Sequence, residues 1–164
     1  MTIRFVRIAG QADRIYVKRS NGSEVAWDFP TFGNEIPHDM VHLVVESLFG
    51  LSKGFWGRVD AGVDPKKVNE MANRRGGANK YAGFGENLSE LYLAEALAGL
   101  SWQLRELTPA DRLAAFRTTC EKLSLTPPPN VTEESLAAAE GRINELRAEW
   151  RARLPKGTLE LTFA

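Results

Sequence analysis

Residues 36–50 carry the pattern that most restricts the fold of this chain, because they describe one helix with two different faces. At about 100° per residue, His38, His42 and Glu46 lie within roughly 80° of one another, and Asp39 lies beside them. The opposite face is apolar, with Met40, Val41, Val44, Val45, Leu48 and Phe49. This segment is therefore predicted to be a helix with an apolar stripe toward the core and a stripe of metal-ligating and acid–base side chains on the other side.

Both ends of the chain alternate apolar and polar residues, as strands with one buried face do. Residues 2–9, 13–18 and 24–29 form three such segments, and an Asn-Gly turn lies between the last two. Residues 158–163 alternate in the same way, and we expect them to return to the same sheet. Helices are predicted between the strands, at 37–49, 65–74, 86–103, 108–123 and 132–150. The prediction is an α+β fold with a small antiparallel sheet from the N-terminal strands and the C-terminal strand, packed with four to five helices.

Length and charge restrict the function further. With 164 residues, the chain fits a single domain, 1–164. Its formal net charge is zero, which argues against nucleic acid as the main partner, and no apolar run approaches the ~18 residues of a membrane span. The single cysteine, Cys120, cannot form an internal disulfide and is predicted to be buried. We expect a cytoplasmic protein whose ligand, if it has one, is a small molecule or a peptide.

Two segments allow more than one interpretation. Residues 66–80 hold five basic residues and one acidic residue, a pattern that suits either contact with phosphates or a solvated loop. Phe55 and Trp56 lie in a segment with four glycines between residues 50 and 62. That segment either folds back over the histidine helix and shapes a cleft, or serves as a connector whose two aromatic rings fill the core.

Two histidines at positions i and i+4 of a helix can ligate one metal ion, because their ring nitrogens meet above one face. His38 and His42 would supply two ligands, and Glu46 is the nearest candidate for a third. Zinc takes a tetrahedral set of N, S or O ligands, and catalytic sites use three protein ligands and one water. The predicted cofactor is zinc or another divalent transition metal. Three other carboxylates could be brought in by the fold as the third ligand instead: Asp60, Asp64 and Glu86.

The run His38-Asp39-Met40-Val41-His42 resembles the His-Glu-x-x-His signature of zinc metallopeptidases, with Asp in place of Glu. The resemblance implies that His38 and His42 ligate zinc and that Asp39 is the catalytic base that activates water. Asp is one methylene shorter than Glu, and the downstream third-ligand motif of that family is absent.

A wider resemblance covers residues 29–62. The elements Pro37-His38-Asp39, His42 and Gly54-Phe55-Trp56-Gly57 are similar to a segment found in a group of uncharacterised bacterial proteins. The resemblance implies a recurrent structural unit and brings no activity with it.

Two functional hypotheses follow. The first is a zinc-binding protein that acts as a small metal-dependent hydrolase through the His-x-x-x-His helix. The second is a non-enzymatic protein-interaction or regulatory module in which the histidines are structural and hydrogen-bonded to Asp39 or Glu46. Its candidate surfaces are the Arg74–Lys80 loop, the Phe55/Trp56 segment and the last helix. A metal-free acid–base site, with a histidine oriented by one of the two acids, is a third use of the same residues.

Overall fold

The structure is a computed structural model. It describes residues 1–9, 11–29, 35–68, 81–153 and 156–164. The predicted basic loop at 74–80 and the second half of the helix predicted at 65–74 lie outside the described residues.

Strands from both ends of the chain form one four-stranded antiparallel sheet, in the order β3-β2-β1-β4. The strands are β1 (Thr2–Arg7), β2 (Asp13–Lys18), β3 (Glu24–Phe29) and β4 (Gly157–Thr162). Ile3 of β1 lies opposite Val17 of β2 on one side and Leu161 of β4 on the other. The predicted return of the C-terminal strand to the N-terminal sheet is therefore confirmed.

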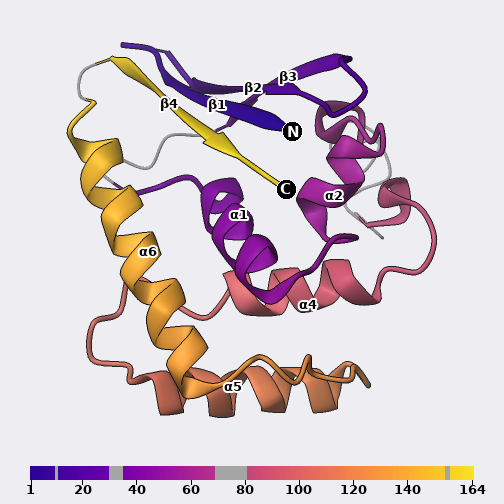
Figure 1. Ribbon diagram of the computed structural model, residues 1–164, viewed down its shortest axis with the longest axis vertical. Helices are drawn as coiled ribbons and strands as arrows, with labels where there is room; N and C mark the ends of the chain where they lie inside the picture. Colours follow the sequence, from indigo (N-terminus) through magenta and orange to yellow (C-terminus); the bar gives the residue numbers. More distant parts are fainter. Residues whose placement is uncertain (10, 30–34, 69–80, 154–155) are drawn as a thin grey trace.

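One face of this sheet is covered and the other is open (Figure 1). Successive side chains of a strand point to opposite faces, so every second residue of β1 and β2 is buried. The buried apolar residues of the sheet are Ile3, Phe5, Ile15, Val17, Trp27 and Leu159. These side chains form one side of the hydrophobic core, and the helices pack against them.

The helical elements are α1 (His38–Phe49), α2 (Phe55–Asp60), the 3₁₀ turn η1 (Ala82–Phe84), α4 (Ser89–Ala98), α5 (Pro109–Lys122) and α6 (Glu133–Arg151). Thr108 and Thr132 begin α5 and α6 with capping boxes that satisfy free backbone N–H groups. The predicted α+β class is confirmed. Among the described helices, none is long and apolar enough to cross a membrane.

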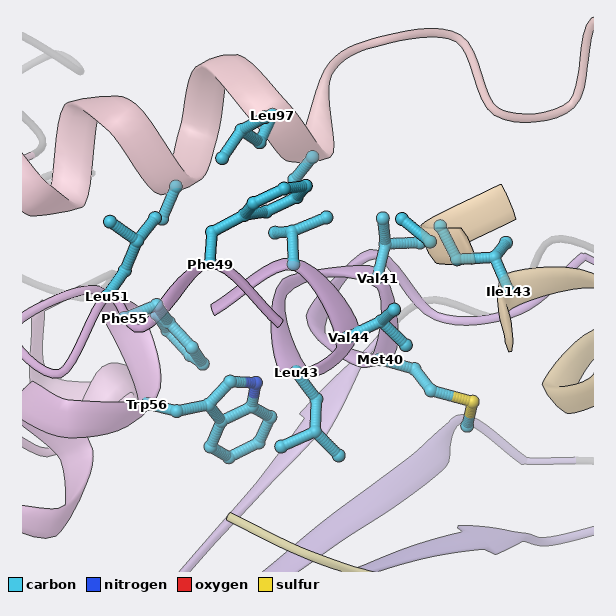
Figure 2. Close-up of a cluster of buried hydrophobic side chains, with 14 of the residues drawn as sticks. Met40, Val41, Leu43, Val44, Phe49, Leu51, Phe55, Trp56, Leu97 and Ile143 are labelled. Carbon is cyan, nitrogen blue, oxygen red and sulfur yellow. The ribbon is translucent and has the colours of Figure 1, made fainter. Parts of the chain in front are cut away.

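Helix α1 lies in the middle of the molecule, beneath the sheet and beside α2, α4 and α6 (Figure 1). Every residue from Met40 to Glu46 is buried, and so is Phe49. Gly50 ends the helix with a φ of 69°, in the left-handed conformation that glycine adopts without strain. The apolar stripe predicted for α1 fills the core, as Figure 2 shows for Met40, Val41 and Val44, except that Leu48 is 42% exposed. Its polar stripe is only partly covered: His42 and Glu46 are buried, whereas His38 at the start of the helix is exposed.

The segment after α1 is partly helical. Phe55 and Trp56 begin α2 and point into the core (Figure 2). The core-filling interpretation of these rings is thus correct, although Phe55 also packs on the His42 ring, with centroids 5.6 Å apart. Gly57 permits close packing here, since a Cβ at this position would lie 1.7 Å from the carbonyl oxygen of Ser52.

The apolar stripe of the last helix also belongs to the core of the chain itself. Its buried residues are Leu136, Ala139, Ile143, Leu146 and Trp150. Cys120 of α5 is buried as predicted, and burial raises the pKa of its thiol.

Candidate metal centre

Helices α1 and α4 bring together two histidines and a glutamate. The ligand atoms of His38, His42 and Glu95 all lie within 4.8 Å of one another. Nε2 of His38 is 3.9 Å from a carboxylate oxygen of Glu95, and Nε2 of His42 is 3.8 Å from the same oxygen. The two imidazole rings lie with their centroids 4.8 Å apart and their planes at 81°. Within the described part of the chain, this is the one group of three or more His, Cys, Asp or Glu side chains that converges in this way.

These distances can be compared with those of a metal site. Zinc binds imidazole nitrogen and carboxylate oxygen at about 2.0–2.2 Å, which places neighbouring ligand atoms of a tetrahedron about 3.3 Å apart. The separations of 3.8 and 3.9 Å exceed that value by little more than half an ångström. The ligand atoms of the two histidines can be as far apart as 4.8 Å, so both rings would have to rotate inward to close the group around an ion. Two imidazoles and one carboxylate are a ligand set suited to zinc and its neighbours in the first transition series.

Exposure differs strongly among the three side chains. The His42 side chain is 2% exposed, that of Glu95 is 30% exposed, and that of His38 is 56% exposed. The group therefore has a buried end at His42 and an open end at His38. An ion held here could be reached from solvent on the His38 side.

Glu46 occupies a different place from the one predicted. One of its carboxylate oxygens lies 3.0 Å from Nδ1 of His42 and accepts the backbone N–H of Phe55 at 2.9 Å. The other oxygen accepts the backbone N–H of Trp56 at 2.9 Å. Glu46 is thus on the Nδ1 side of the His42 ring, and it is not a member of the converging group.

Asp39 lies at the other end of the site, next to His38. Its carboxylate accepts the indole N–H of Trp27 at 3.2 Å, and its backbone carbonyl accepts the indole N–H of Trp56 at 2.8 Å. Burial raises the pKa of the Asp39 carboxyl, and the nearby His42 and the Trp27 indole only partly offset this. A half-buried carboxylate with a raised pKa is a better proton acceptor than an ordinary aspartate.

The charges of the site are strongly coupled. Burial lowers the pKa of His42, but Glu46 and Glu95 outweigh this and raise it to about 9. Burial also raises the pKa of Glu95, yet its two histidine partners bring the net value well below the usual range. In Glu46 burial prevails over His42 and the two backbone amides, and the pKa is raised. Without an ion, the group is therefore held together by a proton on His42.

The remaining carboxylates that the sequence offered as third ligands lie elsewhere. Asp60 accepts the backbone N–H and the hydroxyl of Ser20, both at 2.7 Å. Asp64 accepts the backbone N–H of Lys66 at 3.0 Å, and Glu86 is exposed. None of the three is in the converging group.

A cleft of about 410 Å³ is lined by His38 and Asp39 of α1, by Ala98 of α4 and by Trp150 of α6. Its lining also includes Arg147, whose guanidinium is 3.2 Å from the Glu35 carboxylate. Aromatic rings form much of its wall: Phe29, Trp102 and Trp150. Trp102 and Trp150 are both buried in the core, and both also border this cleft.

Glu95 is the site residue that the sequence analysis missed. It is the one charged residue in the otherwise apolar run Leu93–Leu100 of a predicted helix. Burial of a carboxylate is unfavourable unless the charge has a partner. The position of this acid in an apolar run therefore indicated that it pairs with another polar group. Comparison with protein-family models, with curated proteins and with solved structures gave no match to this chain.

Proposed function

We propose that this protein binds zinc, or a closely related divalent transition metal, through His38, His42 and Glu95, and that it acts as a small metal-dependent hydrolase. The observation that carries the proposal is the convergence of three ligand atoms from two helices, to within 4.8 Å. The carboxylate of Glu46 behind His42 supports it, since histidines that bind metals nearly always donate their second N–H to such a group.

Three protein ligands suit catalysis better than a purely structural role. Zinc with three protein ligands keeps a fourth position for water and lowers the pKa of that water to about 7. Asp39 is placed to accept a proton, because it lines the cleft next to His38 and its pKa is raised by burial. In this proposal Asp39 keeps the role of catalytic base, while Glu95 takes the ligand position first assigned to Glu46.

The cleft is the proposed substrate site. Its volume of about 410 Å³ lies in the range of ~300–1,000 Å³ in which small-molecule sites fall. Aromatic walls favour an apolar or aromatic group on the substrate. A small ester or amide, or the end of a peptide, would place its carbonyl near His38 and its apolar part against Trp102.

The second candidate function is a non-enzymatic module in which the histidines are structural. The observation in its favour is the position of His42 between two carboxylates, 3.0 Å from Glu46 and 3.8 Å from Glu95, which raises its pKa to about 9 and lets a proton take the place of a metal. Two of its interaction surfaces lose support, because Phe55, Trp56 and the stripe of α6 are buried. The Arg74–Lys80 loop lies outside the described residues.

Elemental analysis of the purified protein tests the choice between the two functions. The hydrolase proposal expects about one metal ion per chain, retained on dialysis and restored by zinc after chelation. His38→Ala should abolish this binding with little change in stability, because the side chain is 56% exposed. Glu86→Gln, which alters an exposed acid outside the group, should bind like the wild type. A protein that is purified without metal and takes up none at micromolar zinc would support the structural function instead.

A further inference from the structure

We infer that Glu46 is a positioning residue, which fixes the tautomer of His42 so that Nδ1 carries the proton and Nε2 is turned, with its lone pair, toward Glu95. The inference deepens the proposed function, on which its consequence for metal binding rests. The tautomer itself is a property of the metal-free protein and can be tested without any ion.

The hydrogen bonds of Glu46 determine which tautomer neutral His42 adopts. The carboxylate receives three donors: Nδ1 of His42 at 3.0 Å, and the backbone N–H groups of Phe55 and Trp56, each at 2.9 Å. Backbone N–H groups can only donate, so they favour an ionised carboxylate that accepts from all sides. Neutral His42 then has to place its one proton on Nδ1. Its Nε2, which lies 3.8 Å from the Glu95 oxygen, is left as the metal-binding nitrogen.

The carboxylate cannot easily move away from this position. Glu46 is 1% exposed, and a Cβ on Gly54 would lie 2.6 Å from its carboxyl carbon. Only glycine at position 54 therefore allows the backbone of residues 54–56 to close over the carboxylate. Helix α2 is itself anchored through its Arg58, which donates to the carbonyls of Lys53 at 2.9 Å and Phe84 at 2.6 Å. Helix α2 and Glu46 thus form one rigid support behind His42.

Glu46→Gln tests the inference because an amide has one acceptor oxygen where the carboxylate has two. If the amide NH₂ faces Nδ1, the His42 proton has to move to Nε2, and the backbone N–H of Phe55, which shares that acceptor oxygen, loses its partner. If the amide oxygen faces Nδ1, the NH₂ opposes the N–H of Trp56, and that buried donor loses its partner. The ring ¹⁵N resonances of metal-free protein above pH 9 report the tautomer. The wild type is expected as the Nδ1–H form, and the variant should populate the Nε2–H form and bind zinc about 10–100-fold more weakly.

Glu90→Gln is the matched control. The Glu90 carboxylate accepts the backbone N–H of Lys53 at 2.7 Å, so it holds the same connector, and within the described residues no hydrogen bond or ion pair joins it to His42. This variant should keep the wild-type tautomer and zinc affinity.

A wild-type protein whose neutral His42 carries its proton on Nε2 would overturn the inference, even if Glu46→Gln fails to fold. So would a folded Glu46→Gln variant with an unchanged tautomer. A wild-type protein that shows the Nδ1–H form yet binds no zinc would leave the positioning role standing and refute the proposed metal function, so the two failures are distinguishable.

Discussion

His42 and Glu46 form a buried pair in which Nδ1 of the imidazole lies 3.0 Å from a carboxylate oxygen, with side-chain exposures of 2% and 0%. The opposite nitrogen of the same ring faces Glu95. One histidine therefore connects a rigid, fully buried support to a partly open group of ligands. A proton or a metal ion can occupy the open nitrogen, but not both, and most of the expected behaviour follows from this competition.

Glu95→Gln removes the charge of the ligand that α4 supplies. Zinc binding should weaken at least 100-fold, because an amide is a poor ligand and the positive ion would lose its one anionic partner in the group. Competition with a chromogenic chelator measures the affinity, and circular dichroism checks that the fold is kept. Glu86→Gln is the control, since Glu86 is exposed. Equal affinities for the two variants would remove Glu95 from the site.

The part of the site that lies on one helix could be predicted from the sequence. The spacing of His38 and His42 fixes their common face, because residues four positions apart in a helix lie on the same side whatever the rest of the fold is. The sheet was predictable for a similar reason, since alternation in each strand sets the buried face. The place of Glu95 depends on how α4 packs against α1, and no local pattern fixes that packing.

The role of Glu46 could not be predicted for a different physical reason. Helical spacing correctly placed its carboxylate near His42, but it does not predict which side of the ring the carboxylate faces. That choice is made by the backbone N–H groups of Phe55 and Trp56, which residue identity does not reveal. The glycine at position 54 is consistent with close packing of the backbone against a side chain. It is equally consistent with a flexible turn, so it did not identify the contact with Glu46.

The stability of the metal-free protein should fall as pH rises from about 6.5 to about 9. The pKa of His42 is raised to about 9 in the folded protein, from about 6.5 in the unfolded chain. Its contribution is therefore fully present below pH 6.5 and is lost as pH rises through 9, on the order of 3 kcal/mol in the free energy of unfolding. Urea denaturation in the presence of a chelator measures this slope. His42→Gln should flatten it, and a wild-type stability that is constant over this range would contradict the buried ion pair.

Zinc binding should release about one proton at pH 7, because zinc has to displace the proton on Nε2 of His42. The affinity should rise close to tenfold per pH unit up to about pH 9 and then level off. Isothermal titration calorimetry in two buffers with different ionisation enthalpies gives the number of protons released. A pH-independent affinity between pH 7 and 9 would mean that His42 is not a ligand.

Gly54→Ala should weaken both the fold and the metal site. The new Cβ would lie 2.6 Å from the Glu46 carboxyl carbon, and that carboxylate is held by three hydrogen bonds. We expect a loss of about 1–3 kcal/mol in stability and a 10–100-fold loss in zinc affinity. Gly141→Ala, within α6 and with nothing near its Cβ, should instead stabilise the protein by about 0.5–1 kcal/mol. Thermal unfolding and zinc titration of both variants provide the comparison.

Asp39→Asn separates catalysis from metal binding. Asparagine is nearly isosteric and its side-chain oxygen can still accept the Trp27 indole N–H, so the fold and the zinc content should be unchanged. An amide cannot accept the proton of an attacking water, and the rate of ester hydrolysis by the zinc-loaded protein should fall about 10²–10⁴-fold. Hydrolysis of p-nitrophenyl acetate, corrected for the rate of the zinc-free protein, is a simple first assay. Equal rates for the wild type and Asp39→Asn would assign the base to another group, whereas a parallel loss of zinc would show that Asp39 supports the site structurally, since it lies next to His38 on α1.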